Sequence, residues 1–536
     1  SKMQAPTNSF TYRAASDFGI KVESLLLMDM TDHPILNAKF IKQNMIELTN
    51  QLGINLIFTS KGRGYFPRDH FIPFPYEDCS FIFPECGIYE GQIPVRTGSV
   101  VDNKIQNIDQ SQQHIVISKE EINNAIEKAF SYMICDRSLP FCYTKHDFFL
   151  GFLGKTLSYA DQALKDFRIL LKQKKCSPLF LEGGTIYTMT VKEERVTYLS
   201  ESLFYTNLIL HRKSGLKATE NRQGIHDQTI KEIYETFIKM FLLGLCKIEG
   251  NMGTLTPGQL TTKRYEWQAS DSDLNFVEYL KEKKLIAPLP LSCDSFLKQH
   301  ALLASKFKSC EDWLFASFRV LFKSKVVILP EAGYHFDIFM RPGPRGTMLL
   351  QSYKVTTTFL EIIQKSPTVF SLSEKDLKIL PRYIATAKKL HDTLEPLLKK
   401  ISSKLIESGV PVIDVPAVFY DETFGDSNQF KGQETYHVNF INGISGFSSK
   451  RNKYYFITLG AQVGDFLGQS LMDIFCWYMQ QLEPQLEVYY VGRNPDHPED
   501  YSESMRFLNV PFFNNMASQA GLHCMTVELK YSSHTE

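Results

Sequence analysis

Residues 521–526 read Gly-Leu-His-Cys-Met-Thr, and the rest of the chain can be interpreted outward from this stretch. The thiol of Cys524 lies there in a turn, directly before an apolar–polar alternation at 526–529 that is typical of a strand. A free cysteine is most often an inert packing residue, because Cys is among the most buried residue types. A nucleophilic Cys needs a histidine partner from elsewhere in the chain, and a cationic substrate needs carboxylates. Both occur upstream, at His335, Asp337, Glu182 and Asp69.

Length and charge narrow the class of protein. The chain has 536 residues, which suits one large domain with insertions, and 43% of them are hydrophobic, enough for a substantial core. Lys+Arg and Asp+Glu are balanced at 59 each, so no net field favours nucleic acid or an anionic membrane. The best apolar run, residues 237–246, is too short to span a bilayer. We therefore expect neither a nucleic-acid partner nor a membrane span.

The ten cysteines form no C-x-x-C pair and no spacing typical of metal ligands. This pattern predicts reduced thiols, as in a cytoplasmic compartment, with no disulfide framework and no bound metal. No cofactor is expected either. The sequence begins Ser1-Lys2-Met3, so a removed signal peptide stays open and the compartment is left unassigned.

Strand-like and helix-like segments alternate along the chain, which predicts an α/β protein. Predicted strands lie at 54–59, 178–181, 326–329, 410–415 and 486–491, and helical spacing of apolar residues occurs at 157–171, 390–405 and 463–475. The stretch 190–322 differs, with a helical face at 230–241 and a Gly/Thr/Pro loop at 250–262. We therefore expect one β/α unit in two parts, residues 1–189 and 323–536. Residues 190–322 would be a mostly helical insertion that enlarges the core or covers a substrate.

The candidate side chains follow predicted strands, where active-site residues gather in α/β proteins. Two carboxylates, Asp69 and Asp337, can hold a planar guanidinium by its N–H groups and leave its central carbon open to the sulfur of Cys524. His335 would protonate departing ammonia and then activate water, and Glu182 would orient His335. A spacing of two puts His335 and Asp337 on one side of an extended segment. These residues suit attack by a thiolate on a planar cation.

Four motifs occur in order along the chain: Pro67-Arg68-Asp69, Glu182-Gly183-Gly184, His335-x-Asp337 and Gly521-Leu522-His523-Cys524-x-Thr526. In this order they resemble the motifs of the guanidino-group-modifying enzymes, the pentein superfamily, over residues 67–526. The resemblance implies a pseudo-five-fold β/α propeller with the active site at its centre, here with a mostly helical insertion. It also implies Cys524 as nucleophile, His335 as acid and base, Asp69 and Asp337 as guanidinium ligands, and Glu182 as the carboxylate that supports the histidine.

The resemblance favours a deiminase that converts arginine in a peptide or protein to citrulline and ammonia through a covalent thiouronium intermediate. His523 before the nucleophile resembles the peptidylarginine and agmatine deiminases, whereas free-arginine deiminases usually have Arg there. The Glu182-Gly183-Gly184 motif is closer to enzymes of small substrates, so a small guanidino compound such as agmatine is the alternative. Because Asp69 comes early in this sequence, we expect no counterpart of the immunoglobulin-like domains of the animal peptidylarginine deiminases, and their calcium dependence is not carried over.

Arg341 and Arg345 follow the His-x-Asp motif in a Pro/Gly loop. Such a loop is often plain surface, but the two guanidinium groups could also contact the backbone or carboxylate of a substrate, and both are candidate substrate-binding residues. Two other classes stay open: an amidinotransferase, which passes the amidino carbon to an amine, and a non-catalytic protein that keeps the scaffold for binding. The complete set of catalytic residue types argues against the non-catalytic protein. An amidinotransferase uses similar catalytic groups and differs in excluding water and admitting a second substrate, and the hydrolase is the reading that we adopt.

Overall fold

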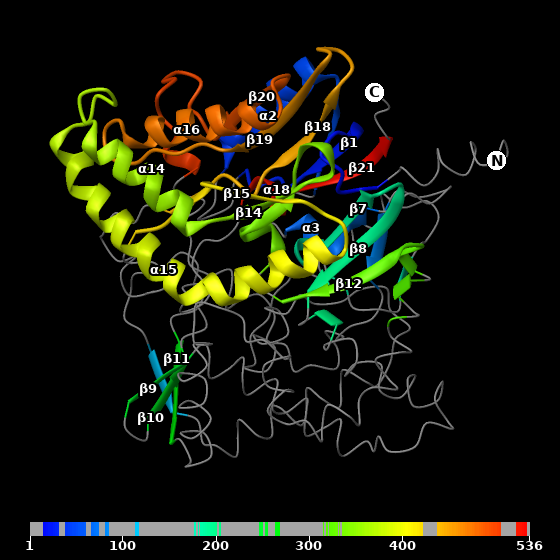
Figure 1. Cartoon of the computed structure of the whole chain (residues 1–536), viewed down its shortest axis with the longest axis horizontal. Coiled ribbons are helices and arrows are strands. Elements are labelled where there is room, and N and C mark those ends of the chain that lie inside the picture. Colours follow the sequence, from blue (N-terminus) through cyan, green and yellow to red (C-terminus); the bar gives the residue numbers. More distant parts are fainter. Residues whose placement is uncertain are drawn as a thin grey trace.

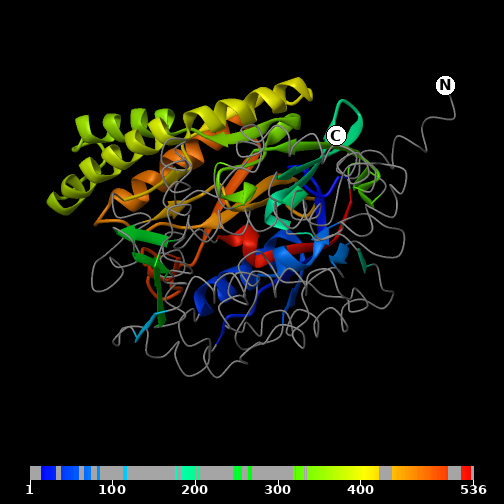
Figure 2. The same cartoon turned by 90° about the horizontal axis from the view of Figure 1, so that it is seen from below.

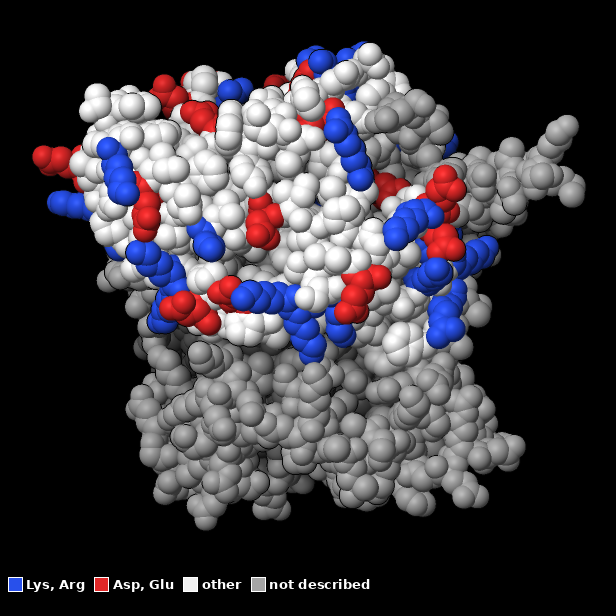
Figure 3. Space-filling view, viewed as in Figure 1, with Lys and Arg blue, Asp and Glu red and all other residues white. Residues whose placement is uncertain are grey.

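The protein is a mixed α/β structure of small sheets with helices packed against them (Figure 1). The computed structural model describes residues 14–31, 38–59, 66–73, 81–84, 113–116, 176–177, 181, 183–200, 203–204, 246–249, 252–255, 263–268, 315, 318–319, 321–330, 332, 335–421, 437–504 and 521–532. Among these residues, no helix is long and apolar enough to cross a membrane. On the face shown in Figure 3, basic and acidic side chains are interspersed over the described part, as the balanced composition predicts.

Five three-stranded sheets in the described chain share one pairing pattern: the middle strand has an antiparallel neighbour on one side and a parallel neighbour on the other. The middle strands are β1 (Lys21–Leu27), β4 (Phe81–Pro84), β8 (Glu194–Ser200), β14 (Met348–Gln351) and β19 (Lys453–Leu459). Their antiparallel neighbours are β21 (Thr526–Ser532), β3 (Ile72–Pro73), β7 (Ile186–Val191), β13 (Met340–Pro342) and β18 (Ile444–Ser448). Their parallel neighbours are β2 (Asn55–Phe58), β6 (Cys176–Ser177), β12 (Lys325–Leu329), β15 (Val412–Val415) and β20 (Leu486–Val491).

Helices make the crossovers that parallel neighbours need. The helix α2 (Lys39–Leu52) connects β1 to β2, and α16 (Leu467–Leu482) connects β19 to β20. Two helices, α14 (Tyr353–Lys365) and α15 (Glu374–Glu407), connect β14 to β15. A hairpin followed by a helical crossover is therefore shared by the sheets of β14 and β19.

The first sheet joins the two ends of the described chain. The strand β21 pairs antiparallel with β1, so that Leu27 lies opposite Thr526. The blue strand β1 and the red strand β21 run side by side in Figures 1 and 2. Because Cys524 comes just before β21, this pairing fixes the thiol relative to the N-terminal strand.

Several predicted elements are confirmed. The strands at 54–59, 326–329, 410–415 and 486–491 correspond to β2, β12, β15 and β20. The helix at 390–405 is part of α15, and the helix at 463–475 corresponds to α16, which begins later, at Leu467. The predicted helix at 157–171 and the helical face at 230–241 lie outside the described residues. Of the predicted strand at 178–181, only Leu181 is described.

The stretch 190–322 contains more strand than its sequence suggested. Three strands, β9 (Cys246–Glu249), β10 (Met252–Leu255) and β11 (Lys263–Gln268), form a four-stranded sheet with β5 (Gln113–Val116). Figure 1 shows this sheet set apart from the other labelled strands, below α15. The expected boundary at 189 falls inside β7, and β8 pairs with both β7 and β12. The described part of this stretch is therefore sheet-rich and tied to the flanking segments by β8.

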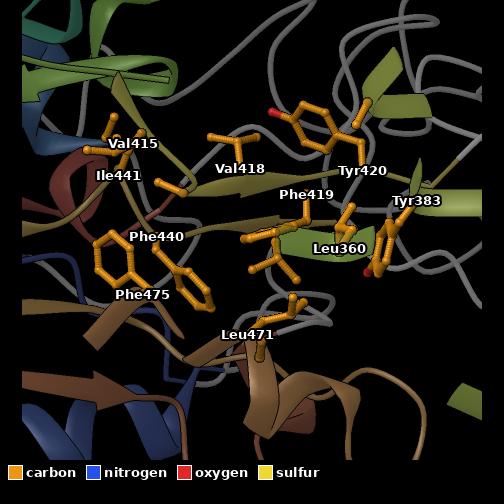
Figure 4. Close-up of a cluster of buried hydrophobic side chains, with 14 of the residues drawn as sticks. Leu360, Tyr383, Val415, Val418, Phe419, Tyr420, Phe440, Ile441, Leu471 and Phe475 are labelled. Carbon is orange, nitrogen blue, oxygen red and sulfur yellow. The ribbon is translucent and has the colours of Figure 1, made fainter. Parts of the chain in front are cut away.

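A hydrophobic cluster lies between α14, α15 and α16 and the neighbouring strands, which include β16 (Val418–Phe419) and β17 (Val438–Asn439) (Figure 4). Phe440, at the end of β17, is fully buried, and its ring centroid lies 5.1 Å from that of Phe475 in α16. Burying such a ring contributes about 1.5–3 kcal/mol. The core thus anchors the turn after β17, and this turn reaches the thiol.

Candidate active site

The thiol of Cys524 lies in α18 (Leu522–Met525), a single helical turn that runs directly into β21. Only 7% of Cys524 is exposed. The hydroxyl of Thr526 donates to the carbonyl oxygen of Leu522 across 2.9 Å and so closes the turn. The strand that the sequence predicted after the cysteine is confirmed, and it holds the thiol at a helix–strand junction.

Asp337 brings a buried carboxylate to the thiol. Its Oδ2 lies 3.5 Å from Sγ of Cys524 and accepts a hydrogen bond from Nδ1 of His523 across 2.7 Å. Its Oδ1 is buried and has no hydrogen-bond partner among the residues that the structure describes. A buried carboxylate oxygen without a donor is unfavourable, so a ligand that supplied an N–H group would be stabilised there.

The prediction that the chain is extended from His335 to Asp337 is wrong in part. His335 is extended, at φ −130° and ψ 159°, but Asp337 lies in η4 (Phe336–Ile338), a 3₁₀ turn. The two residues that flank Asp337 are also buried, so the alternation of faces in a strand does not decide where the carboxylate points. The turn delivers Asp337 to the thiol instead.

His335 and Asp69 form a second pair. Nδ1 of His335 lies 3.9 Å from Oδ1 of Asp69, which belongs to α3 (Pro67–His70). Both side chains are mostly buried, with exposures of 7% and 12%. Gly184, in η3 (Gly183–Thr185), packs on the ring: a Cβ at this position would lie 2.5 Å from Nδ1 of His335. The motif of two glycines therefore leaves room for the histidine.

Arg68 connects the Asp69 segment to the cysteine segment. Its guanidinium forms a bidentate ion pair with Glu528 of β21, at 2.9 and 3.1 Å, and its Nε donates to the carbonyl oxygen of His523 across 3.2 Å. Arg68 and Glu528 are both buried. This ion pair fixes the distance between the carboxylate of Asp69 and the turn that carries Cys524.

The surroundings of Cys524 keep its thiol protonated. Burial raises the pKa of Cys524 well above its usual 9.0, and the carboxylates of Asp337 and Asp69 raise it further. The backbone of Gly521 and the side chain of Asn442 act in the opposite direction. Two negative charges beside a sulfur atom are unfavourable for a thiolate unless a cation lies among them.

The surroundings favour the ionised form of Asp337 and the neutral form of His523, the hydrogen-bonded pair beside the thiol. Burial alone would raise the pKa of Asp337, but the hydrogen bond from His523 and the nearby His335 and Arg68 bring it below its usual value. Burial lowers the pKa of His523, and the charge of Arg68 lowers it further, against the effect of Asp337. Asp337 is therefore ionised at neutral pH.

Sequence reasoning missed Asn442 and the bond between His523 and Asp337. Asn442 lies beside the thiol, with Nδ2 3.2 Å from Sγ of Cys524. The available signal was a polar residue in the apolar run of residues 440–444, Phe-Ile-Asn-Gly-Ile. Cys524 lies more than eighty positions away along the chain, so residue spacing gives no indication that Asn442 contacts it.

The two predicted substrate-binding arginines lie in different surroundings. Arg341 is buried, and its guanidinium donates to the carbonyl oxygens of Gly443 and Pro342 and to Oγ of Ser445. Arg345 has 71% of its side chain exposed and lies 3.4 Å from the carboxylate of Glu483. The hydrogen bonds of Arg341 are thus made to groups of the protein itself, whereas Arg345 is accessible to solvent. The predicted support for His335, Glu182, lies outside the described residues.

Replacing Glu528 by glutamine is expected to destabilise the protein by about 3–5 kcal/mol at pH 7, because Arg68 would keep a buried charge without its partner. Burial raises the pKa of Glu528, but Arg68 brings it below the usual 4.5, so the stabilisation is present above that pH and is lost as the pH falls through the lowered pKa. Denaturant unfolding at several pH values should therefore show the difference between wild type and Glu528→Gln shrinking below pH 4.5.

The matched control is Glu487→Gln, which removes the same bidentate geometry from the more exposed pair with Arg451. Its effect should stay within about 1 kcal/mol. Equal effects of the two substitutions would contradict a structural role for the buried pair.

In the described part of the chain, no three His, Cys, Asp or Glu side chains are grouped as metal ligands. No family model and no curated protein matches this sequence. Among solved structures, the chain is similar to two of agmatine deiminase from C. jejuni, one a Cys-to-Ser variant with substrate bound. Each has 9% identity and a TM-score of 0.35, and the matches cover 97% of this chain and 97% and 96% of the other chains.

A third solved structure, of a protein provisionally assigned as a peptidyl-arginine deiminase, has 9% identity and a TM-score of 0.36, with 97% of this chain and 99% of that chain covered. All three bear deiminase names.

Proposed function

We propose that this chain is a cysteine-dependent deiminase, a hydrolase that converts a guanidinium group to a ureido group and ammonia. The observation that carries the proposal is the buried thiol of Cys524 beside the carboxylate of Asp337, with Oδ1 of Asp337 left without a hydrogen-bond partner in the described structure. An ordinary nucleophilic thiol has a cationic neighbour that favours the thiolate. Here the neighbours are anionic, so the missing positive charge is best supplied by the substrate.

A guanidinium fits the missing charge in shape as well as in sign. Its N–H groups match carboxylate oxygens in pairs, so Asp337 and Asp69 would hold two edges of the plane. The bound cation would also offset the two negative charges that raise the pKa of Cys524. Binding would then favour the thiolate only when the carbon to be attacked is in place.

The reaction balances with the residues at hand. As the substrate binds, the thiol proton of Cys524 passes to His335. The thiolate then attacks the guanidinium carbon, a C–N bond breaks, and ammonia leaves with that proton from His335, giving a thiouronium adduct. His335 then takes a proton from water, which attacks the same carbon, and the C–S bond breaks to return the thiolate. The products are a ureido group and an ammonium ion, and no cofactor or metal takes part.

The repeated sheets support a propeller as the fold behind this site. We propose that the five three-stranded sheets form a pseudo-five-fold ring, because all five share one pairing pattern and the first contains strands from both ends of the described chain. An experimental structure tests this arrangement. Five sheets in a ring around Cys524 would support it, and an open row would not.

Arginine in a peptide or protein is the proposed substrate, and an agmatine-like small guanidine is the alternative. His523 before the nucleophile supports a peptide or agmatine over free arginine, and the exposed Arg345 could contact the backbone carbonyls or a carboxylate of a peptide. The close packing of Gly184 on His335 belongs to the motif that is closer to enzymes of small substrates.

The test compares kcat/KM for a blocked arginine peptide, free arginine and agmatine, with detection of the ureido product. The peptide should have the highest value. A hundredfold preference for agmatine or free arginine would replace the peptide by the small guanidine. No ureido product from any of the three would contradict deimination, and transfer of the amidino group to an added amine would indicate the amidinotransferase.

His335→Gln is expected to lower kcat by about 10²–10⁴-fold, because His335 moves protons in both half-reactions. Intact-mass measurement after mixing with substrate tests the second step: an adduct on Cys524 should persist longer than in the wild type. The control is His391→Gln, which removes an imidazole paired with Glu395 on the surface of α15. Unchanged kcat in His335→Gln would move the acid–base role to His523.

A further inference from the structure

Asn442 is a fully buried side chain that contacts the proposed nucleophile with both ends of its amide. Nδ2 donates to Sγ of Cys524 across 3.2 Å, and Oδ1 accepts from the backbone N–H of the same residue at 3.3 Å. The reverse orientation would set two donors face to face and turn the amide oxygen toward the sulfur. The contacts with Cys524 therefore fix the amide with its N–H group facing Sγ.

The turn that carries Asn442 is held on both sides. Oδ1 of Asn439 accepts from the backbone N–H groups of Ile441 and Asn442, at 3.0 and 3.1 Å. Nδ2 of Asn439 donates to the carbonyl oxygen of Ile338 across 2.9 Å. Since Ile338 follows Asp337, this bond ties the Asn442 turn to the carboxylate segment.

The cysteine turn approaches Asn442 closely. The backbone N–H of His523 donates to the carbonyl oxygen of Asn442 at 3.4 Å. A Cβ at position 521 would lie 2.6 Å from Oδ1 of Asn442, so Gly521 lets the two turns meet. The amide is thus built into the site and is not a side chain that happens to fill space.

We propose that Asn442 is a further catalytic residue, whose amide aims Sγ of Cys524 and stabilises the thiolate that attacks the substrate. The proposal rests on the proposed function because it takes Cys524 as the nucleophile. Two carboxylates oppose ionisation of this thiol, and Asn442 supplies a hydrogen bond that favours it. A donor to the charged sulfur strengthens as charge develops, which is what stabilisation of a reacting state requires.

The test measures alkylation of Cys524 by iodoacetamide, resolved by peptide mass spectrometry at pH 7 and pH 8 without any substrate. Asn442→Asp keeps the shape and the acceptor for the backbone N–H but replaces the donor by an anionic oxygen. Alkylation of Cys524 should become about tenfold slower or more at both pH values, since one pKa unit changes the thiolate fraction tenfold. Asn442→Ala removes the donor without adding charge, and a smaller slowing is expected.

Two controls separate this effect from general damage. Cys476, a partly buried free thiol in α16, should be alkylated at the wild-type rate in every variant. Asn44→Ala removes an amide whose Oδ1 accepts from Gly492 and Arg493, away from the thiol, and should leave Cys524 unchanged.

Wild-type alkylation of Cys524 in folded Asn442→Asp would overturn the proposal, and if that variant does not fold, wild-type alkylation in Asn442→Ala would overturn it. Slower alkylation in a chain that forms no ureido product would leave the role of Asn442 intact and contradict only deimination. The readout therefore separates the two proposals.

Discussion

Cys524→Ala is expected to abolish formation of the ureido product, with kcat lowered about 10⁴-fold or more. The thiol is the only group in the proposed reaction that forms a bond to the guanidinium carbon, and removing a nucleophile costs several orders of magnitude. Initial rates with the blocked arginine peptide, together with intact-mass analysis, give the measurement. Neither product nor adduct should be detected in this variant.

The fold should survive this substitution, because one buried sulfur is lost and the β1–β21 pairing is untouched. Thermal unfolding and circular dichroism check this point. The matched control is Cys476→Ala, which should keep wild-type activity. A Cys524→Ala protein that retained a tenth of the wild-type rate would rule out covalent catalysis through this thiol.

Asp337→Asn is expected to change two measurable properties in opposite directions. Turnover of the peptide should fall about 10²–10³-fold in kcat/KM, because losing one partner of a buried charge pair costs about 2–5 kcal/mol. Alkylation of Cys524 in the free protein should become faster, because the carboxylate of Asp337 is one of the groups that raise the pKa of this thiol. A residue that only supported the fold would lower turnover without making the thiol more reactive.

A second carboxylate–thiol pair, Asp473 and Cys476 in α16, provides a control for this substitution. Burial raises the pKa of Cys476, and the charge of Asp473 raises it further. Asp473→Asn should therefore speed alkylation of Cys476 while leaving peptide turnover unchanged. If Asp337→Asn slowed alkylation of Cys524, or left turnover intact, the carboxylate would not be a ligand for a cation beside the thiol.

The sequence was most informative where apolar residues formed a short bounded run or recurred at helical spacing. Residues 486–491 alternate little but form a short run between turn residues, and they are β20 as predicted. The helix at 390–405 was also predicted, but α15 begins much earlier, at a capping box made by Ser373 and Asp376. Pro381 and Pro396 lie inside α15, where packing against the core overrides their usual preference for helix ends.

The candidate site was predictable as a set of residue types but not as a set of contacts. Motif order indicated Asp337 and Cys524, and the structure places them 3.5 Å apart. The partners that complete this contact, His523 and Asn442, act through side-chain geometry across separate turns, which spacing along the chain does not encode. Within 190–322, the Gly/Thr/Pro composition of residues 250–262 suggested a loop, although β10 lies there in a sheet with β9 and β11.

The pairing of β21 with β1 has a consequence for the order of events during synthesis. Thr526 lies opposite Leu27, so the ribosome must make nearly all of the described chain before the turn that carries the thiol can dock. Contacts of such long sequence separation form late, since closing a long loop is entropically unfavourable until the rest of the chain is ordered. An emerging polypeptide would hold Asp69, His335 and Asp337 long before it held the thiol in place. Under the proposed function, a chain still on the ribosome would therefore have no activity toward guanidinium groups until folding was complete.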